Sequence, residues 1–125
     1  MSNSGTIRVA LIGAGGMGTK WAHVLAKSPS ASLVCISDQD KSKAEVLAKE
    51  IKDCRAEGDW RAVVQSSDVD AVVIVTPHKF LTEIAIEALK NKKHVLSEKP
   101  GGVSSLEIIK AIKASEESGA KYMIG

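Results

Sequence analysis

The amino-acid sequence predicts one α/β domain with a doubly wound parallel sheet of about six strands flanked by helices. The chain has 125 residues, of which 44% are hydrophobic and 26% charged. This composition is enough to form one buried core, and it excludes general disorder. Short apolar runs rich in Val and Ile alternate with amphipathic segments along the chain. Strands that alternate with helices in this way pair in parallel through right-handed crossovers.

The strands and helices follow from run length, periodicity and the residues that end each run. Strands are predicted at 7–12, 33–37, 70–75, 94–97 and 121–124, with at most a short strand within 53–58. Helices are predicted at 16–27, after Asp40, after Asp59, around 81–89, and from a capping box at 104–107 to a stop at Gly119. In the first helix Met17, Trp21, Val24 and Leu25 are spaced to lie on one side, and in the last helix Ile108, Ile109 and Ile112 follow the capping box.

Charge and composition argue against several kinds of partner. The 17 basic and 15 acidic residues are interspersed and give a net charge of +2, so no nucleic-acid surface is expected. The polar start of the chain is no signal peptide, and no apolar run is long enough to span a membrane. We therefore expect a cytoplasmic protein without membrane contact. Cys35 and Cys54 are not part of a cluster of metal-ligand residues, so no metal site is expected.

A glycine motif follows the first predicted strand. Residues 13–18 read Gly-Ala-Gly-Gly-Met-Gly, which matches GxGxxG between a strand and a helix. In this motif Gly13 permits a tight turn, Gly15 allows a pyrophosphate to approach the backbone, and Gly18 allows close packing of the helix on the strand. Free N–H groups at the helix start would hold the phosphates. The alternative is that these glycines only form a tight turn.

An acidic residue stands 20 residues after the motif, at the end of the second predicted strand. Asp38 can accept hydrogen bonds from both ribose hydroxyls and would repel a 2′-phosphate, which favours NAD as the cofactor over NADP. Lys41 and Lys43 lie near the same loop and could contact a 2′-phosphate, so NADP stays possible. The alternative for Asp38 is a helix cap, and that for the lysines is a solvated helix surface.

Glu98, Lys99 and Pro100 follow the fifth predicted strand. Ligands of doubly wound sheets bind beyond the carboxyl ends of the strands, so this segment belongs to the expected ligand crevice. A partly desolvated lysine beside a cationic nicotinamide would lose its proton more readily, and Lys99 could then exchange a proton with a substrate oxygen. From spacing alone, a surface ion pair of Glu98 and Lys99 remains the alternative.

The succession of these motifs resembles the glucose/fructose oxidoreductase, inositol dehydrogenase and rhizopine-catabolism family (Gfo/Idh/MocA). The resemblance runs from residue 7 to 125 and rests on 13–18, Asp38, 70–77 and 93–100; the Glu-Lys-Pro after a Lys-His-Val strand is its most specific part. It implies a Rossmann-type fold and an NAD(P)-dependent oxidoreductase. Such enzymes transfer a hydride between the nicotinamide and a CH–OH group of a sugar, cyclitol or related polyol.

The resemblance also implies roles for particular residues. Gly13, Gly15, Gly16 and Met17 would contact the pyrophosphate, Asp38 the adenosine ribose, and Thr76, Pro77 and His78 the dinucleotide further along, with Glu98, Lys99 and Pro100 at the nicotinamide end. Lys99 would be the catalytic residue that touches both cofactor and substrate. Family members carry a second, substrate-binding domain that residues 1–125 lack. We therefore expect a dinucleotide-binding domain that binds cofactor without turnover, and a full-length homo-oligomer.

Two functions from other classes remain as alternatives. The first is a non-catalytic module that senses NAD(P) and regulates a partner, although the Glu-Lys-Pro segment would then have no purpose. The second is a methyltransferase that uses S-adenosylmethionine. Methyltransferases usually have GxGxG with an acid just before the glycines, whereas Leu11 and Ile12 precede the motif here, so this alternative is disfavoured.

Overall fold

A computed structural model describes residues 6–98 and 105–125 and leaves the side chains of His78 and Lys79 undescribed. The elements are β1 (Ile7–Ile12), α1 (Gly16–Lys27), β2 (Ala31–Ser37), α2 (Lys41–Ala48), β3 (Arg55–Glu57), α3 (Trp60–Val64), β4 (Ala71–Ile74), α4 (His78–Lys90), β5 (His94–Ser97), α5 (Ser105–Ser118) and β6 (Tyr122–Ile124). The strands form one parallel sheet in the order β3-β2-β1-β4-β5-β6. The predicted fold class is confirmed, and each predicted element is present with ends that differ by at most a few residues.

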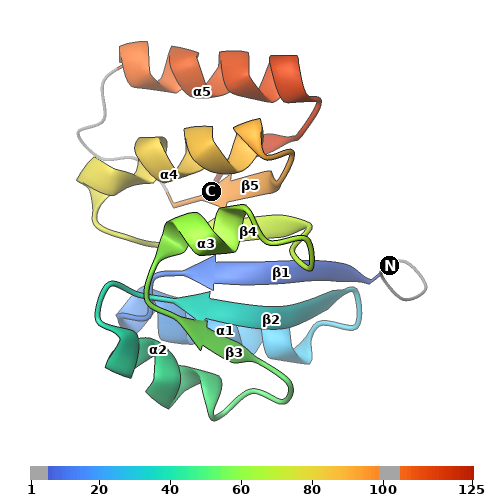
Figure 1. Ribbon diagram of the computed structural model, residues 1–125, viewed down its shortest axis with the longest axis vertical. Coiled ribbons are helices and arrows are strands. Elements are labelled where there is room, and N and C mark those ends of the chain that lie inside the picture. The colour runs from blue at the N-terminus through green and yellow to red at the C-terminus, as the bar shows by residue number, and fades with distance from the viewer. Residues whose placement is uncertain (1–5, 99–104) are drawn as a thin grey trace.

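The helices cover the two faces of the sheet in two groups. α1 and α2 pack on one face, around a hydrophobic cluster that includes Leu11 and Ile36. α3, α4 and α5 pack on the other face, around a cluster that includes Ile12 and Ile74. Figure 1 shows α4 and α5 together at one end of the molecule and α2 at the other. The chain changes direction between β1 and β4, and this reversal leaves a crevice at the carboxyl ends of the strands.

The buried side of α1 differs from the prediction. Val24 and Met17 are exposed, with 61% and 47% of their surface accessible, whereas Gly18, Ala22 and Leu25 are buried. The reason is the close approach of α1 to the sheet, which selects the side of the helix that carries the smallest residues. A hydrophobic periodicity of this kind gives the helix correctly, but it does not decide which of two neighbouring sides is buried.

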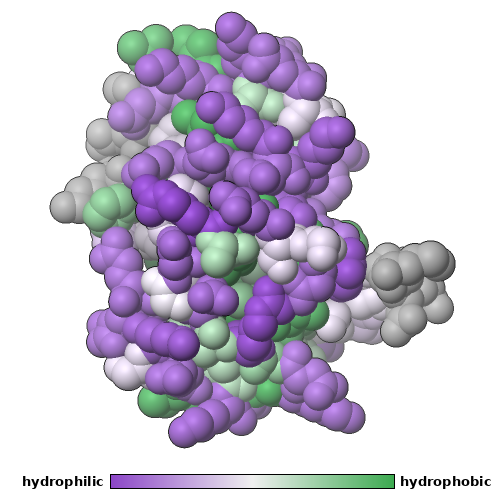
Figure 2. Space-filling model, in the orientation of Figure 1, coloured by the Kyte–Doolittle hydropathy of each residue, from purple (hydrophilic) through white to green (hydrophobic). Residues whose placement is uncertain are grey.

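The last helix likewise buries its small residues. In α5 the buried residues are Ala111 and Ala114, while Ile109 and Ile112 are exposed. Figure 2 shows a mostly hydrophilic face with hydrophobic residues gathered at its upper edge, over the first part of α5. Alanines allow α5 to lie close to α4, so the larger side chains point outward. The predicted stop is confirmed, because α5 ends before Gly119, which has a φ of +78°.

Charged side chains connect the amino ends of the strands. Arg8 donates from Nη2 to Oδ1 of Asp70 over 2.9 Å and from Nε to Oδ2 over 3.1 Å. Arg55 pairs with Asp68, and Lys93 donates to a carbonyl oxygen of the loop before β4. The arginine partners hold the pKa values of Asp70 and Asp68 at about 2, well below their ordinary value. Ion pairs therefore connect the segments at this end of the sheet.

Within 6–98 and 105–125, no helix has the length and apolar character needed to cross a membrane.

Candidate functional site

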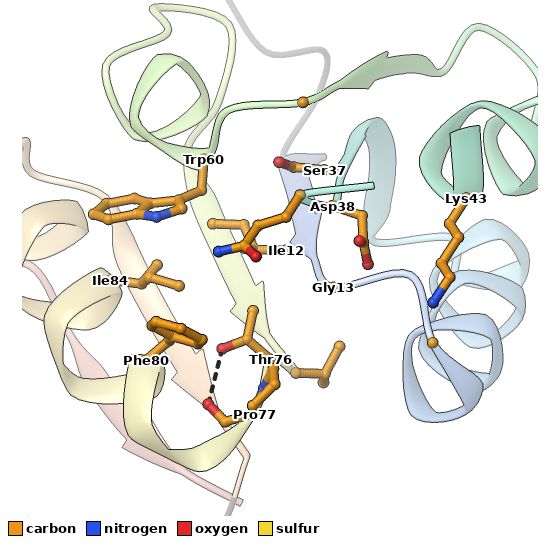
Figure 3. A pocket seen from close by; sticks show the side chains of 14 residues that line it. Ile12, Gly13, Ser37, Asp38, Lys43, Trp60, Thr76, Pro77, Phe80 and Ile84 are labelled. Atoms are coloured by element: carbon orange, nitrogen blue, oxygen red, sulfur yellow. Dashed lines mark hydrogen bonds between the residues drawn. The ribbon is translucent and has the colours of Figure 1, made fainter. Parts of the chain in front are cut away.

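A pocket of about 310 Å³ opens at the carboxyl ends of β1, β2 and β4. Its volume lies at the lower end of the range typical of small-molecule sites. Figure 3 shows aromatic side chains on one side of this pocket and charged side chains on the other. The lining residues are Ile12, Gly13, Gly15, Ser37, Asp38, Gln39, Lys43, Gly58, Trp60, Val75, Thr76, Pro77, Phe80 and Ile84.

The turn after β1 requires glycine at two positions. Gly13 has a φ of +114°, in the region that L side chains rarely adopt, and a Cβ there would lie 2.8 Å from the carbonyl oxygen of Val75. A Cβ on Gly18 would overlap the carbonyl oxygen of Gly13. These contacts support the predicted roles: Gly13 makes the turn, and Gly18 lets α1 pack against it.

The surroundings of Gly15 differ from those of Gly13 and Gly18. A Cβ on Gly15 would meet no atom within 4 Å, so packing within the described chain does not require glycine there. Gly15 is the N-cap of α1 and provides no side-chain cap, whereas Asp40 caps α2 and Asp59 caps α3. The first N–H groups of α1 therefore have no capping side chain, and Gly15 lines the pocket. Such a helix start, with its positive dipole end, is suited to bind a phosphate.

Asp38 is fixed opposite the glycine turn by hydrogen bonds to the backbone. Its Oδ2 accepts from the N–H of Ala14 over 2.8 Å, and its Oδ1 accepts from the N–H of Asp40 over 2.9 Å. Each carboxylate oxygen has further acceptor capacity, which hydroxyl groups can use. The prediction that Asp38 and the glycine turn share one site is thus supported by their geometry.

The apolar wall of the pocket was missed in the sequence analysis. Trp60, Phe80 and Ile84 come from α3 and α4 and face Asp38 across the pocket (Figure 3). Arg61 lies over the Trp60 ring at 4.5 Å from its centroid and also pairs with Glu83 of α4 over 3.5 Å. A signal was available, because an aromatic residue directly after a strand lies at the carboxyl edge where ligands bind. The strand before Trp60 is only three residues long, so the sequence did not clearly place Trp60 after a strand.

The segment after β4 contributes another open helix start. Thr76 and Pro77 line the pocket, and Pro77 is the N-cap of α4 without a side-chain cap. The hydroxyl of Thr76 donates to the carbonyl oxygen of Pro77 over 3.5 Å (Figure 3). His78 is the first residue of α4, and its side chain is not described. Thr76 and Pro77 thus lie at the pocket, and their contacts with a cofactor stay predictions.

The remaining predicted site residues do not line the pocket or fall outside the described residues. Gly16 begins α1, and the exposed side chain of Met17 does not line the pocket, so a phosphate contact at these positions would use backbone N–H groups. Glu98 donates its N–H to the carbonyl oxygen of Ile74, which places it at the carboxyl end of the sheet but outside the pocket. Lys99 and Pro100 fall outside the described residues, and their roles stay predictions.

The two lysines of α2 have different positions. Lys43 lines the pocket beside Asp38, whereas Lys41 does not. The stem of Lys41 instead lies along Gly58, where an added Cβ would be 3.5 Å from the Cβ of Lys41. The structure therefore separates two residues that the sequence analysis treated alike.

Comparison with known proteins gives relatives over nearly the whole chain. This chain is 36% identical over 124 residues to inositol 2-dehydrogenase 4 of Saccharopolyspora erythraea. The match covers 98% of this chain and 36% of that protein. It is 33% identical over 119 residues to 2,7-anhydro-N-acetylneuraminate hydratase of Escherichia coli, covering 95% of this chain and 31% of the other. The chain spans about a third of the length of these curated relatives.

A solved structure has the same fold with a cofactor present. It is scyllo-inositol dehydrogenase from Lactobacillus casei with bound NAD(H) and scyllo-inositol, at 30% identity and a TM-score of 0.87, covering 96% of this chain and 36% of that one. The family model described as "Oxidoreductase family, NAD-binding Rossmann fold" matches residues 7–125. The predicted family and its cofactor class are confirmed: the chain belongs to the Gfo/Idh/MocA oxidoreductase family, whose Rossmann domain binds NAD.

Proposed function

We propose that this chain is the dinucleotide-binding domain of an NAD-dependent oxidoreductase that acts on polyols. The observation that carries the proposal is the pairing of an uncapped α1 N-terminus with a fixed carboxylate, Asp38, in one pocket. A dinucleotide needs both features, because its diphosphate is anionic and its adenosine ribose offers two hydroxyl donors. A site for an uncharged ligand would need neither.

The lining of the pocket supports a specific orientation of the dinucleotide. The adenine would lie against Trp60 and Phe80, since aromatic rings give a base apolar area and stacking. The ribose would contact Asp38, and the diphosphate would lie across Gly15 at the start of α1. The nicotinamide would then extend past Thr76 toward the carboxyl end of β5. The volume of about 310 Å³ suits the adenosine part, while the nicotinamide part would lie along the open edge.

A titration of the 125-residue chain with NADH tests this proposal. Calorimetry measures the affinity, and energy transfer from tryptophan to bound NADH, measured in a Trp21→Phe background, reports on Trp60 in the pocket. We expect saturable binding that Asp38→Ala weakens about tenfold or more, because two ribose hydrogen bonds are lost. Glu45→Ala removes one exposed carboxylate from α2 and is the matched control. Asp38 also binds the backbone, so melting curves and the isosteric Asp38→Asn separate lost binding from lost structure. Absence of any NADH binding would contradict the proposal.

For the longer protein we propose hydride transfer from a CH–OH carbon of a cyclitol or related polyol. NAD would supply the hydride acceptor when bound, and Lys99 would take the hydroxyl proton from the substrate oxygen. This proposal for Lys99 rests on the resemblance of 93–100 to the family. With the longer protein, NADH formation from inositols measures activity, and Lys99→Ala is expected to lower kcat about tenfold or more with a much smaller change in cofactor affinity. Equal turnover would exclude this role.

A second reaction is proposed because of one relative. The protein that is 33% identical to this chain carries the name of a hydratase, so family membership does not fix the overall reaction. The assay of the longer protein therefore also follows addition or loss of water on an anhydro-sugar, without net NADH formation. Binding of NADH with neither reaction would instead favour the non-catalytic sensing module.

A further inference from the structure

We infer that Arg61 and Glu83 are positioning residues that hold the Trp60 ring as a fixed wall for a purine base. This inference rests on the proposed function and deepens it, because it names the residues that prepare the base-binding part of the same pocket. Neither Arg61 nor Glu83 lines the pocket, so both act through Trp60, which does.

The part of the wall that comes from α3 is weakly held by the helix itself. α3 is only five residues long, and an isolated helix of this length is not stable in water. Its buried side chains, Val63 and Val64, are at its carboxyl end. Trp60 is its first residue and is only half-buried. The orientation of the Trp60 ring therefore depends on contacts other than those of the α3 backbone.

Arg61 makes the contacts that fix this ring. The Cζ atom of its guanidinium lies 4.5 Å from the centroid of the Trp60 ring, within the range of a cation–π contact. Its Nη2 lies 3.5 Å from Oε2 of Glu83 on α4. Its backbone N–H donates to Oδ1 of Asp59, the N-cap of α3, over 3.0 Å. Arg61 thus joins the ring to α4 and to the start of α3.

Glu83 provides the fixed end of this connection. It belongs to a helix of 13 residues, and the next residue, Ile84, is buried in the core. Phe80, three residues earlier, and Ile84 both line the pocket. Figure 3 shows Ile84 between Trp60 and Phe80 on one side of the pocket. The contact of Arg61 with Glu83 therefore sets how the α3 part of the wall lies relative to the α4 part.

A ring that is already fixed favours binding of a base. Ordering a mobile side chain during binding lowers the affinity, and a ring held in place beforehand avoids this loss. The ion pair itself is exposed, with 60% of the Arg61 side chain and 55% of the Glu83 side chain accessible, so it contributes little to stability. We therefore expect its effect on ligand affinity, by about two- to fivefold, rather than on stability.

The first test uses the opposite charges of the two residues. The 125-residue chain is titrated by calorimetry with NADH and with 5′-AMP. Arg61→Ala and Glu83→Ala are each expected to weaken both ligands about two- to fivefold, because each releases the Trp60 ring. If the two residues acted only as general charge, Glu83→Ala would instead strengthen the binding of these anions. Glu87→Ala, the matched control, removes the same charge one turn further along α4. Glu87 makes no ion pair among the described residues, so either affinity should change less than about twofold.

A second test follows the ring itself. In a Trp21→Phe background Trp60 is the remaining tryptophan, and its fluorescence anisotropy reports the rotational freedom of its side chain. Without ligand, Arg61→Ala and Glu83→Ala should both lower this anisotropy, and Glu87→Ala should not. The double variant Arg61→Ala/Glu83→Ala should bind NADH at most about twofold more weakly than Arg61→Ala, because both residues act on one ring.

The outcomes distinguish the inference from the proposed function. If neither ligand binds the unaltered chain, the proposed function fails, and the inference fails with it. If both ligands bind but Glu83→Ala strengthens binding, or leaves the affinity and the anisotropy unchanged, only the inference is overturned. Fully additive losses in the double variant would also overturn it, since the residues would then act independently. A melting temperature that falls in step with the affinity would overturn it too, because the pair would then act on the fold and not on the ring.

Discussion

The two ends of the parallel sheet use the same residue types in opposite ways. At the amino end, Arg8 and Asp70 form a two-point ion pair, and Arg55 pairs with Asp68. At the carboxyl end, Lys43 has no ion-pair partner among the described residues, and Asp38 is held by backbone N–H groups. Charges that satisfy one another stabilise the fold, whereas charges held by the backbone keep capacity for a ligand.

The helix starts show a second contrast, within the carboxyl end of the sheet. α2 and α3 begin with an aspartate that caps the first N–H groups, while α1 and α4 begin without a side-chain cap. The uncapped starts of α1 and α4 are both at the pocket, through Gly15 and Pro77. Incomplete capping costs some stability locally and leaves donors for an anion. We therefore expect substitutions at the amino end to change stability without changing binding. Substitutions at the open carboxyl end should do the reverse.

The largest expected effect is at a position where binding and stability are not separable. Gly18→Ala places a Cβ on the carbonyl oxygen of Gly13, so α1 must move away from the turn. We expect a loss of about 3 kcal/mol or more in the free energy of unfolding, together with lost NADH binding. Urea denaturation measures the first and calorimetry the second. Gly16→Ala is the control for stability, because its Cβ would meet no atom within 4 Å. Wild-type stability in Gly18→Ala would contradict the packing role.

A substitution at the amino end is expected to affect stability alone. Asp70→Asn weakens three hydrogen bonds from Arg8, which come from its backbone N–H, Nε and Nη2. We expect a loss of about 1–2 kcal/mol in the free energy of unfolding and unchanged NADH affinity. Asp53→Asn is a matched control, because Asp53 is exposed and asparagine tolerates its φ of 57°. A change in NADH affinity in Asp70→Asn would contradict the expectation that the amino end of the sheet affects stability and not binding.

A substitution at the carboxyl end is expected to affect binding alone. Gly15→Ala introduces a methyl group where a diphosphate would approach the backbone, and it meets no other atom of the described chain within 4 Å. We expect NADH affinity to fall about tenfold or more, with the free energy of unfolding changed by less than about 1 kcal/mol. Parallel calorimetry and urea denaturation measure the two quantities. Full affinity in this variant would show that the diphosphate does not lie across Gly15.

The smallest expected effect is a dependence of stability on acid pH. Hydrogen bonds from Arg8 and Arg55 lower the pKa values of Asp70 and Asp68 to about 2 in the folded chain, from 3.8. The stabilisation is therefore complete above the unfolded pKa and is lost as the pH falls from about 4 toward 2. Urea denaturation across this range measures it. Asp70→Asn should lose less stability than the wild type over the same interval, and an identical slope would argue against the ion pair.

The local features of the fold and site could be predicted from the sequence with little error. The order of the elements follows from run length and periodicity, and the turn at Gly13 follows from a glycine motif placed between a strand and a helix. Asp38 was found because parallel strands bring their carboxyl ends to one edge. Each of these inferences needs only neighbouring residues and one general rule of sheet topology.

Features that depend on the distance between elements could not be predicted. The exposure of Ile109 and Val24 depends on how closely a helix approaches its neighbour, and a periodic pattern does not contain this distance. The choice of Lys43 over Lys41 depends on the direction of two side chains from one helix turn. The wall formed by Trp60 and Phe80 joins residues from α3 and α4, which are separated by β4 and meet only in the folded chain.

The sequence by itself therefore determined the doubly wound sheet, the glycine turn and the carboxylate at its edge, because these depend on short-range patterns and on the backbone conformation that glycine allows. Only the tertiary structure decided which helix sides are buried, which lysine reaches the pocket and what forms its apolar wall. The physical reason is that packing selects the side of each element that permits the closest approach, and this selection depends on several elements at once.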